Sequence, residues 1–199
     1  MPDAAGSSAP IYTAERIAAV LARRTFDGAL CVVDRCTRLG AECDLLVVTR
    51  NLRAIDVEIK LSRADLKADR VKDKWYDYGE RDRLTGSYRK TTREWPRSVF
   101  KHYYVLPAPI WRVELLQHCM PKSGVIVVDF EHVNARRFSA RRSGALIVKR
   151  RATPNRNCQP LKHETVVDIA RLASLRMWDA YRDLEVARAD NEHERRGAA

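Results

Sequence analysis

The sequence predicts an α/β protein in which helices flank a mixed β-sheet. Two apolar runs, Leu45–Val48 and Ile55–Leu61, enclose the polar turn Thr49-Arg50-Asn51, which is the pattern of a β-hairpin. Two later runs, His102–Leu106 and Gly124–Asp129, are separated by a short helical pattern. Continuous apolar runs that alternate with helices are typical of a sheet that is covered on both faces.

Helices are expected before, between and after these strands. Thr13 begins the first, which runs to about Arg24 and has Glu15 in its first turn. Ser62 is a good N-cap for the second, which we expect to run to about Tyr78. Its apolar and basic sides are expected to consist of Ala64, Ala68, Val71, Trp75 and Tyr78, and of Arg63, Lys67, Arg70 and Lys74. Further on we expect a short helix at Ile110–His118, an edge strand at Ala145–Val148 and a final amphipathic helix at Thr165–Leu184.

We expect a single domain. A chain of 199 residues can bury one sizeable core but is too short for two ordinary domains. The domain is expected to span residues 11–184 and to carry a basic loop insertion at 79–98, a stretch without hydrophobic periodicity. Residues 1–10 are small and polar and are expected to be disordered, and residues 185–199 are expected to form a polar C-terminal tail.

Composition limits the class of protein. The formal net charge of +11 and the pI of about 9.7 favour a polyanionic partner, because lysine and arginine neutralise phosphates. Five cysteines, an odd number without C-x-x-C spacing, argue against a disulfide framework and against a zinc site. No apolar run is long enough to span a membrane and no signal-peptide pattern opens the chain. We therefore expect a reduced, cytoplasmic protein with no membrane partner.

The predicted hairpin carries the residues that we expect to be catalytic. Strand alternation places Asp56, Glu58 and Lys60 on one face, and the neighbouring strand brings Asp44 to the same place. Carboxylates suit Mg²⁺ or Mn²⁺ as ligands. Because Mg²⁺ keeps several of its waters, one or two carboxylates are enough to bind it. We expect Asp44 and Glu58 to hold the ion together with the backbone carbonyl of Ile59. Lys60 is expected to orient or deprotonate an attacking water, or to act as a point charge.

The same residues also have simpler interpretations. An Asp followed by Glu-x-Lys arises by chance, and surface salt bridges use these residue types. Glu15 can be a further carboxylate of the catalytic site, or an ordinary first-turn acid that the helix dipole favours. At the level of the sequence both interpretations stay open.

Basic side chains gather in three stretches that we expect to contact DNA: the helix after the hairpin, the insertion, and the segment from His132 to Arg156. The insertion mixes arginines with Tyr88 and Trp95, which suits contact with phosphates or stacking on unpaired bases. The segment has eight lysines and arginines and no acid. The expected DNA-binding residues are Lys67, Lys74, Tyr78, Arg89, Lys90, Arg136, Arg137, Arg141 and Arg142. The alternatives are a solvated helix face, interspersed with Asp65, Asp69, Asp73 and Asp77, and an insertion without a role.

The order of helix, Asp44, Glu58-Ile59-Lys60, helix and strand resembles the PD-(D/E)XK nuclease superfamily. More closely, E-I-K-L-S-R-A-D-L-K-A-D at Glu58–Asp69 and K-W-Y-D-Y at Lys74–Tyr78 resemble the MmcB-like DNA-repair nuclease family. H-Y-Y-V-L-P at His102–Pro107 and P-K-S-G-V-I-V-V-D at Pro121–Asp129 continue the match, which covers roughly Ile17–Asp129. The resemblance implies a restriction-endonuclease-like sheet, an active site at Asp44, Glu58 and Lys60, and a supporting position near the substrate for Lys74 and Tyr78. The proline of the superfamily's name is absent, because Cys43 precedes Asp44.

The expected function is hydrolysis of DNA phosphodiester bonds with Mg²⁺ or Mn²⁺, in DNA repair or in a phage-type nuclease. A homodimer would suit an enzyme that cuts both strands. The alternative is a non-catalytic DNA-binding module that retains the nuclease fold. The intact set of Asp44, Glu58 and Lys60 favours the enzyme, because a protein that only binds DNA gains nothing from carboxylates that face a phosphate. A basic structural protein that binds another protein through the final helix explains the charge poorly.

Overall fold

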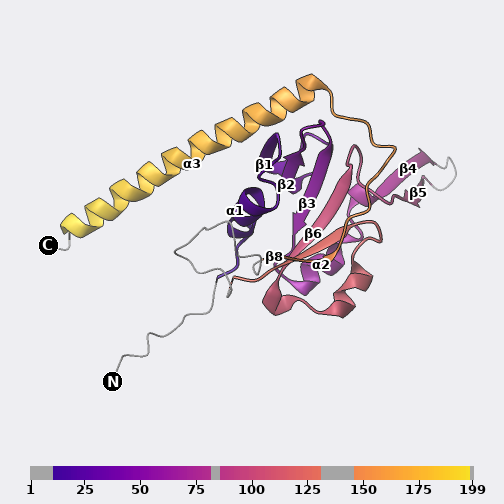
Figure 1. Ribbon diagram of the computed structural model, residues 1–199, viewed down its shortest axis with the longest axis horizontal. Helices are drawn as coiled ribbons and strands as arrows, with labels where there is room; N and C mark the ends of the chain where they lie inside the picture. Colours follow the sequence, from indigo (N-terminus) through magenta and orange to yellow (C-terminus); the bar gives the residue numbers. More distant parts are fainter. Residues whose placement is uncertain (1–10, 82–85, 131–145, 198–199) are drawn as a thin grey trace.

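The computed structural model describes residues 11–81, 86–130 and 146–197. At its centre is a six-stranded sheet with the order β1-β2-β3-β6-β7-β8 (Figure 1). The strands are β1 Cys31–Cys36, β2 Cys43–Val48, β3 Ala54–Ile59, β6 Lys101–Pro107, β7 Gly124–Val128 and β8 Leu146–Arg150. β3, β6 and β7 run parallel to one another and the other neighbours pair antiparallel. The predicted α/β class and mixed sheet are confirmed, and so is the edge strand β8.

Outside this sheet, the described residues also form three α-helices, three short 3-10 helices and a second, two-stranded sheet. They are α1 Ala14–Arg24, α2 Arg63–Asp69, α3 His163–Gly197, η1 Asp73–Trp75, η2 Ala108–Ile110, η3 Val113–His118, β4 Tyr76–Arg81 and β5 Tyr88–Thr92. The two predicted helix starts are confirmed. Thr13 Oγ1 accepts a hydrogen bond from the Arg16 backbone N–H at 3.2 Å, and Ser62 Oγ accepts one from that of Asp65 at 3.1 Å.

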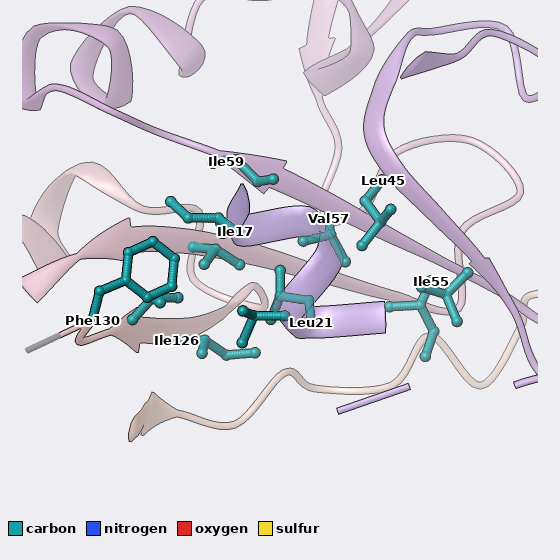
Figure 2. Packing of buried hydrophobic residues seen from close by; sticks show 12 residues of the cluster. Ile17, Leu21, Leu45, Ile55, Val57, Ile59, Ile126 and Phe130 are labelled. Atoms are coloured by element: carbon teal, nitrogen blue, oxygen red, sulfur yellow. The ribbon is translucent and has the colours of Figure 1, made fainter. Parts of the chain in front are cut away.

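Helix α1 covers one face of the large sheet. Its residues Ile17, Val20 and Leu21 pack against alternate residues of the central strands (Figure 2). The strand residues of this cluster are Leu45, Val47, Ile55, Val57, Ile59, Val105, Ile126 and Val128, and Phe130 completes it. Each such side chain contributes roughly 1.5–3 kcal/mol when it is fully buried, so the cluster holds α1 firmly against the sheet. The alternation predicted for β3 is thereby confirmed.

The opposite face is covered in two parts. The first turns of α3 lie over β1 and β2, where Val166 and Ile169 pack against Leu46 and Val48. Over β6 and β7 lies a second cluster, made by α2, η1, η3 and the strands, with Leu66, Trp75, Tyr104, Leu106, Leu115 and Val125 among its members. Between these apolar clusters, β3 presents the carboxylates of Asp56 and Glu58. The fold thus buries charged side chains at the middle of the sheet.

The second helix is shorter than predicted. α2 ends at Asp69, and the chain continues through η1 into β4. Lys74 therefore lies in the 3-10 helix η1 and Tyr78 in strand β4, not on the predicted long helix. The expected apolar stripe is therefore wrong: Val71 is 70% exposed, whereas Trp75 is fully buried. Leu66, which was not part of the expected stripe, and Trp75 reach the same apolar cluster from two different elements.

The loop predicted at 79–98 is wrong in part, because residues 79–81 and Tyr88–Thr92 belong to the hairpin of β4 and β5. Residue pairs Tyr76↔Thr92 and Tyr78↔Lys90 define its antiparallel register, and in Figure 1 it projects beside the main sheet. The hairpin was not predicted from the sequence because its side chains are mostly exposed on both faces, so its strands show no alternation of apolar and polar residues. Cross-strand contacts replace burial: Lys90 Nζ lies 3.6 Å from the ring centroid of Tyr76.

The last helix is longer than predicted. α3 continues to Gly197, through most of the stretch expected to be a polar tail, and its C-terminal half lies clear of the sheet in Figure 1. Among its side chains up to residue 190, those that are buried lie in the first turns, at Val166 and Ile169. The exposed apolar side chains further along are Leu175, Met177, Trp178, Tyr181, Leu184 and Val186.

Several other expectations can be compared with the described residues. All five cysteines are free thiols. In the described ranges no helix is long and apolar enough to cross a membrane. The stretch 1–10, expected to be disordered, and the basic residues Arg136, Arg137, Arg141 and Arg142 lie outside the described residues.

Candidate active site

Asp44 lies where β2 and β3 separate. The last residue pair between these strands is Leu45↔Val57, so the backbone N–H of Ile59 has no strand partner on that side. Asp44 Oδ2 accepts this hydrogen bond at 2.7 Å. Burial and the negative charge of Glu58 raise the pKa of Asp44 above its ordinary value. The hairpin therefore brings the two carboxylates close enough to repel each other.

Glu58 is held by lysines on both of its oxygens. Lys60 Nζ lies 2.6 Å from Oε2, Lys74 Nζ lies 2.6 Å from Oε1, and Lys72 Nζ lies 3.5 Å from Oε2. The Glu58 side chain is only 3% exposed. Although burial opposes ionisation, the charges of Lys74 and Lys60 hold the pKa of Glu58 below its ordinary value. Asp44, Glu58 and Lys60 thus meet as the sequence predicted.

Asp69 is a fourth member of the site, although in the sequence it was named only in the alternative of a solvated helix face. It is fully buried, and its Oδ1 lies 3.0 Å from Lys60 Nζ and 3.1 Å from Lys72 Nζ. Its Oδ2 accepts hydrogen bonds from Trp75 Nε1 at 3.0 Å and from Tyr104 Oη at 2.8 Å. The only local signal is that Asp69 shares the buried side of α2 with Leu66, three residues earlier.

Lys60 is enclosed between these acids. Burial disfavours its ammonium form, but the charges of Glu58 and Asp69 raise the pKa of Lys60 above its ordinary value. The contacts with Glu58 Oε2 and Asp69 Oδ1 fix the ammonium in place. Among the functions expected for Lys60, the geometry suits the point charge better than the proton acceptor.

Asp56 and His102 form a second buried polar group beside the first. His102 Nδ1 lies 2.8 Å from Ser123 Oγ, and His102 Nε2 lies 3.7 Å from Asp56 Oδ2. Lys74 Nζ also lies 3.7 Å from Asp56 Oδ2. Burial raises the pKa of Asp56 to about 6, and burial followed by the charge of Lys74 lowers the pKa of His102 well below its ordinary value. Asp56 Oδ1 and His102 Nε2 have no hydrogen-bond partner among the described residues.

Two cavities flank the cluster. One, of about 400 Å³, is lined by Asp44 and Ile59 from the strands and by Glu15 from α1. Glu15 thus lines the same cavity as Asp44, and its catalytic function stays a prediction. The other, of about 510 Å³, is lined by Lys72, Lys74 and Asp56 and by residues of η1, β4 and the segment 93–99.

Asp44 and Glu58 could bind a divalent ion if one of the lysines that contact Glu58 moved away. Within the described residues no group of three or more His, Cys, Asp or Glu side chains is arranged to hold a metal. Mg²⁺ does not need such a group, since two carboxylates, a carbonyl and waters suffice. The mutual repulsion of Asp44 and Glu58 is what a cation between them would relieve. Because lysines contact both Glu58 oxygens, one ammonium would have to give up its contact.

The expected DNA-binding residues have different surroundings. Lys67 is exposed on α2, and Arg89 and Lys90 are exposed on β5. Tyr78 is 47% exposed, and its hydroxyl donates a hydrogen bond to Asp73. Lys74, by contrast, is only 4% exposed and is bound to Glu58, so it does not lie on an outer basic face.

Fold and site together define an α/β protein whose mixed sheet carries a buried cluster of carboxylates and lysines. No protein-family model matches the chain, and no curated protein matches it. Among solved structures, the chain is similar to the SPO1766 protein of unknown function from Silicibacter pomeroyi. The two share 17% sequence identity with a TM-score of 0.48, over 90% of this chain and 94% of that chain. A likeness at this level carries no argument about fold or function.

Proposed function

We propose that the protein is a divalent-metal-dependent hydrolase of DNA phosphodiester bonds. In this proposal its sheet is the restriction-endonuclease-like core of the PD-(D/E)XK superfamily, with the MmcB-like DNA-repair nucleases as its nearest family. The observation that carries the proposal is the meeting of Asp44, Glu58 and Lys60 where β2 leaves β3. A chain with a net charge of +11 supplies the attraction for a polyanion.

The proposed functions of the residues follow from their contacts. Asp44, Glu58 and the Ile59 carbonyl hold Mg²⁺ or Mn²⁺, which when bound supplies Lewis acidity to offset charge growing on the phosphate. Lys60, fixed as an ammonium, stabilises the same charge. Glu15 shares a cavity with Asp44 and orients a water on the α1 side.

The test uses Asp44→Asn, a variant of nearly unchanged shape. The amide oxygen can still accept the hydrogen bond from Ile59, so the fold is retained while the charge is lost. Single-stranded, duplex and branched DNA are incubated with each variant in Mg²⁺, in Mn²⁺ and in EDTA. We expect cleavage by the wild type to need the metal and to fall at least about 100-fold in Asp44→Asn. The control is Asp34→Asn. Asp34 lines the same cavity as Asp44 and Glu15, but its carboxylate forms ion pairs with Arg35 and Arg176.

The second candidate is a DNA-binding module that retains the fold without cleavage. It is favoured by the lysine contacts on both oxygens of Glu58, which leave this carboxylate already neutralised. If the wild type binds DNA but cuts no substrate with either ion, this second function replaces the first.

A further inference from the structure

The cavity of about 510 Å³ beside Glu58 has the size of a site for a small ligand. Its walls come from segments far apart in the sequence: the residues before β2, Asp56 of β3, η1 with the start of β4, and the segment after β5. Its charged and aromatic lining includes Asp56, Lys72, Tyr76, Tyr78, Arg93 and Arg97. Except for Asp56, they belong to η1, to the hairpin or to the residues that flank them.

Two buried polar atoms in this lining lack hydrogen-bond partners within the described residues. They are Nε of Arg93, which is a donor, and Oδ1 of Asp56, which is an acceptor on a side chain only 2% exposed. The Asp56 carboxylate also interacts with the thiol of Cys43, which lines the same cavity. Arg93 uses its Nη2 for Asp77, so its Nε remains to be satisfied. Buried polar groups without partners are costly, and their presence in a cavity indicates a ligand that both accepts and donates hydrogen bonds.

The rest of the lining narrows the chemistry of that ligand. Lys72 and Arg97 are 47% and 71% exposed at their side chains, which allows them to reach a phosphate. Tyr78 offers an aromatic ring that is 47% exposed. Apolar contacts come from Leu39, Pro96 and Val99. These features match a nucleotide. The cations suit its phosphate, the exposed ring and the apolar walls suit its flat base, and the unpaired acceptor suits an N–H group of the base.

Two lysines of this cavity also contact acids of the candidate active site. Lys74 lines the cavity and binds Glu58 Oε1, and Lys72 lines it and contacts both Glu58 and Asp69. We infer that this cavity receives one unpaired nucleotide of the DNA strand, with the phosphate on Lys72, Arg93 and Arg97, the base on Tyr78 and a base N–H group on Asp56. The inference rests on the proposed function only in taking DNA as the ligand. Because a base stacked within a duplex cannot enter a cavity, the substrate has a single-stranded or extruded nucleotide.

The experiment measures DNA binding in EDTA, where no metal-dependent cleavage occurs. Fluorescence anisotropy compares a labelled single-stranded oligonucleotide, its duplex, and the duplex with a single-stranded overhang. We expect the two DNAs with unpaired nucleotides to bind about tenfold or more tightly than the duplex, and Tyr78→Ala to weaken their binding by about tenfold. Tyr78→Phe, which keeps the ring and loses the hydroxyl, should retain the preference. Arg97→Ala should weaken binding of all DNAs that occupy the cavity.

Matched controls come from α3, where Tyr181→Ala and Arg171→Ala remove exposed side chains of the same kinds away from the cavity. Equal affinity for duplex and single strand, or a loss in Tyr78→Ala no larger than in Tyr181→Ala, would overturn the inference. These outcomes separate it from the proposed function. A protein that cuts duplex DNA without preferring unpaired nucleotides keeps the function and loses the inference. One that shows the Tyr78-dependent preference but cuts nothing keeps the inference and loses the function.

Discussion

Replacing Asp69 with asparagine tests whether the buried ion pairs hold the site together. The change keeps the size of the side chain, and the amide oxygen can still accept from Trp75 and Tyr104. It removes the negative charge that lies 3.0 Å from Lys60 and 3.1 Å from Lys72. Removing one partner of a buried pair costs roughly 3–5 kcal/mol, and Lys60 retains Glu58, so we expect the low end, about 3 kcal/mol. That corresponds to a Tm lowered by roughly 6–12 °C for a domain of this size.

The assay is thermal and urea denaturation at neutral pH, with Asp65→Asn as the control on the same helix. Asp65 is 47% exposed and lies 3.8 Å from Lys60, so its loss should cost at most about 0.5 kcal/mol. Equal stabilities of the two variants would refute the argument that Asp69 is the acid that matters.

The difference between wild type and Asp69→Asn should also depend on pH. Burial opposes ionisation of this group, but the charges of Lys74 and Lys60 hold the pKa of Asp69 below its ordinary value of 3.8. A group whose pKa is depressed by folding contributes stability that is fully present above its ordinary pKa and is lost as the pH falls through the folded value. The difference should therefore be constant near neutral pH and narrow below about pH 4. A difference that widens in acid would contradict the sign.

Three further predictions concern other parts of the molecule. Lys74→Met frees Glu58 Oε1 and should raise the affinity for Mn²⁺ by about tenfold, as measured by calorimetry. The control Lys149→Met replaces an exposed lysine and should leave the affinity unchanged. An unchanged affinity in Lys74→Met would show that this lysine does not compete with the ion. Gly124→Ala should destabilise by about 1–3 kcal/mol in urea, because the added Cβ meets the Tyr103 ring and lies 2.8 Å from the Ala152 backbone nitrogen; Gly28→Ala, with nothing within 4 Å, is the control that should differ from it. Trp178→Glu should abolish a homodimer measured by light scattering, since Trp178 is 62% exposed on α3; a wild type that is monomeric at every concentration would contradict this expectation.

The sequence and the structure agree best where the pattern is local. Alternation along β3 separates Ile55, Val57 and Ile59 from the charged residues, because neighbouring side chains of a strand point to opposite faces. The helix starts at Thr13 and Ser62 could also be predicted from the sequence, since an N-cap side chain binds a backbone N–H group only two or three residues away. The meeting of Asp44 with Glu58 and Lys60 follows from the same hairpin. Their catalytic function stays a prediction.

The errors arose where burial was decided by distant segments. Asp69 and Lys74 looked like surface charges of one long helix, but α2 ends at Asp69 and η1 turns Lys74 inward to Glu58. The contacts of Asp69 with Lys60 and of Lys74 with Glu58 cannot be predicted from hydrophobic periodicity, because each contact joins residues of different elements. The β4–β5 hairpin escaped for the opposite reason: its strands pair through the backbone and bury little.

By itself the sequence determined the α/β class, the starts of α1 and α2, and the placement of three charged residues on one hairpin. These depend on backbone hydrogen bonding and side-chain alternation over a few residues. Only the tertiary structure decided that Lys72 and Lys74 contact Glu58 and that Asp69 contacts Lys60 and Lys72. It also decided that Tyr78 and Arg93 line a cavity next to this cluster. Burying a charge requires an opposite charge to meet it, and the fold supplies that partner from segments that are remote along the chain.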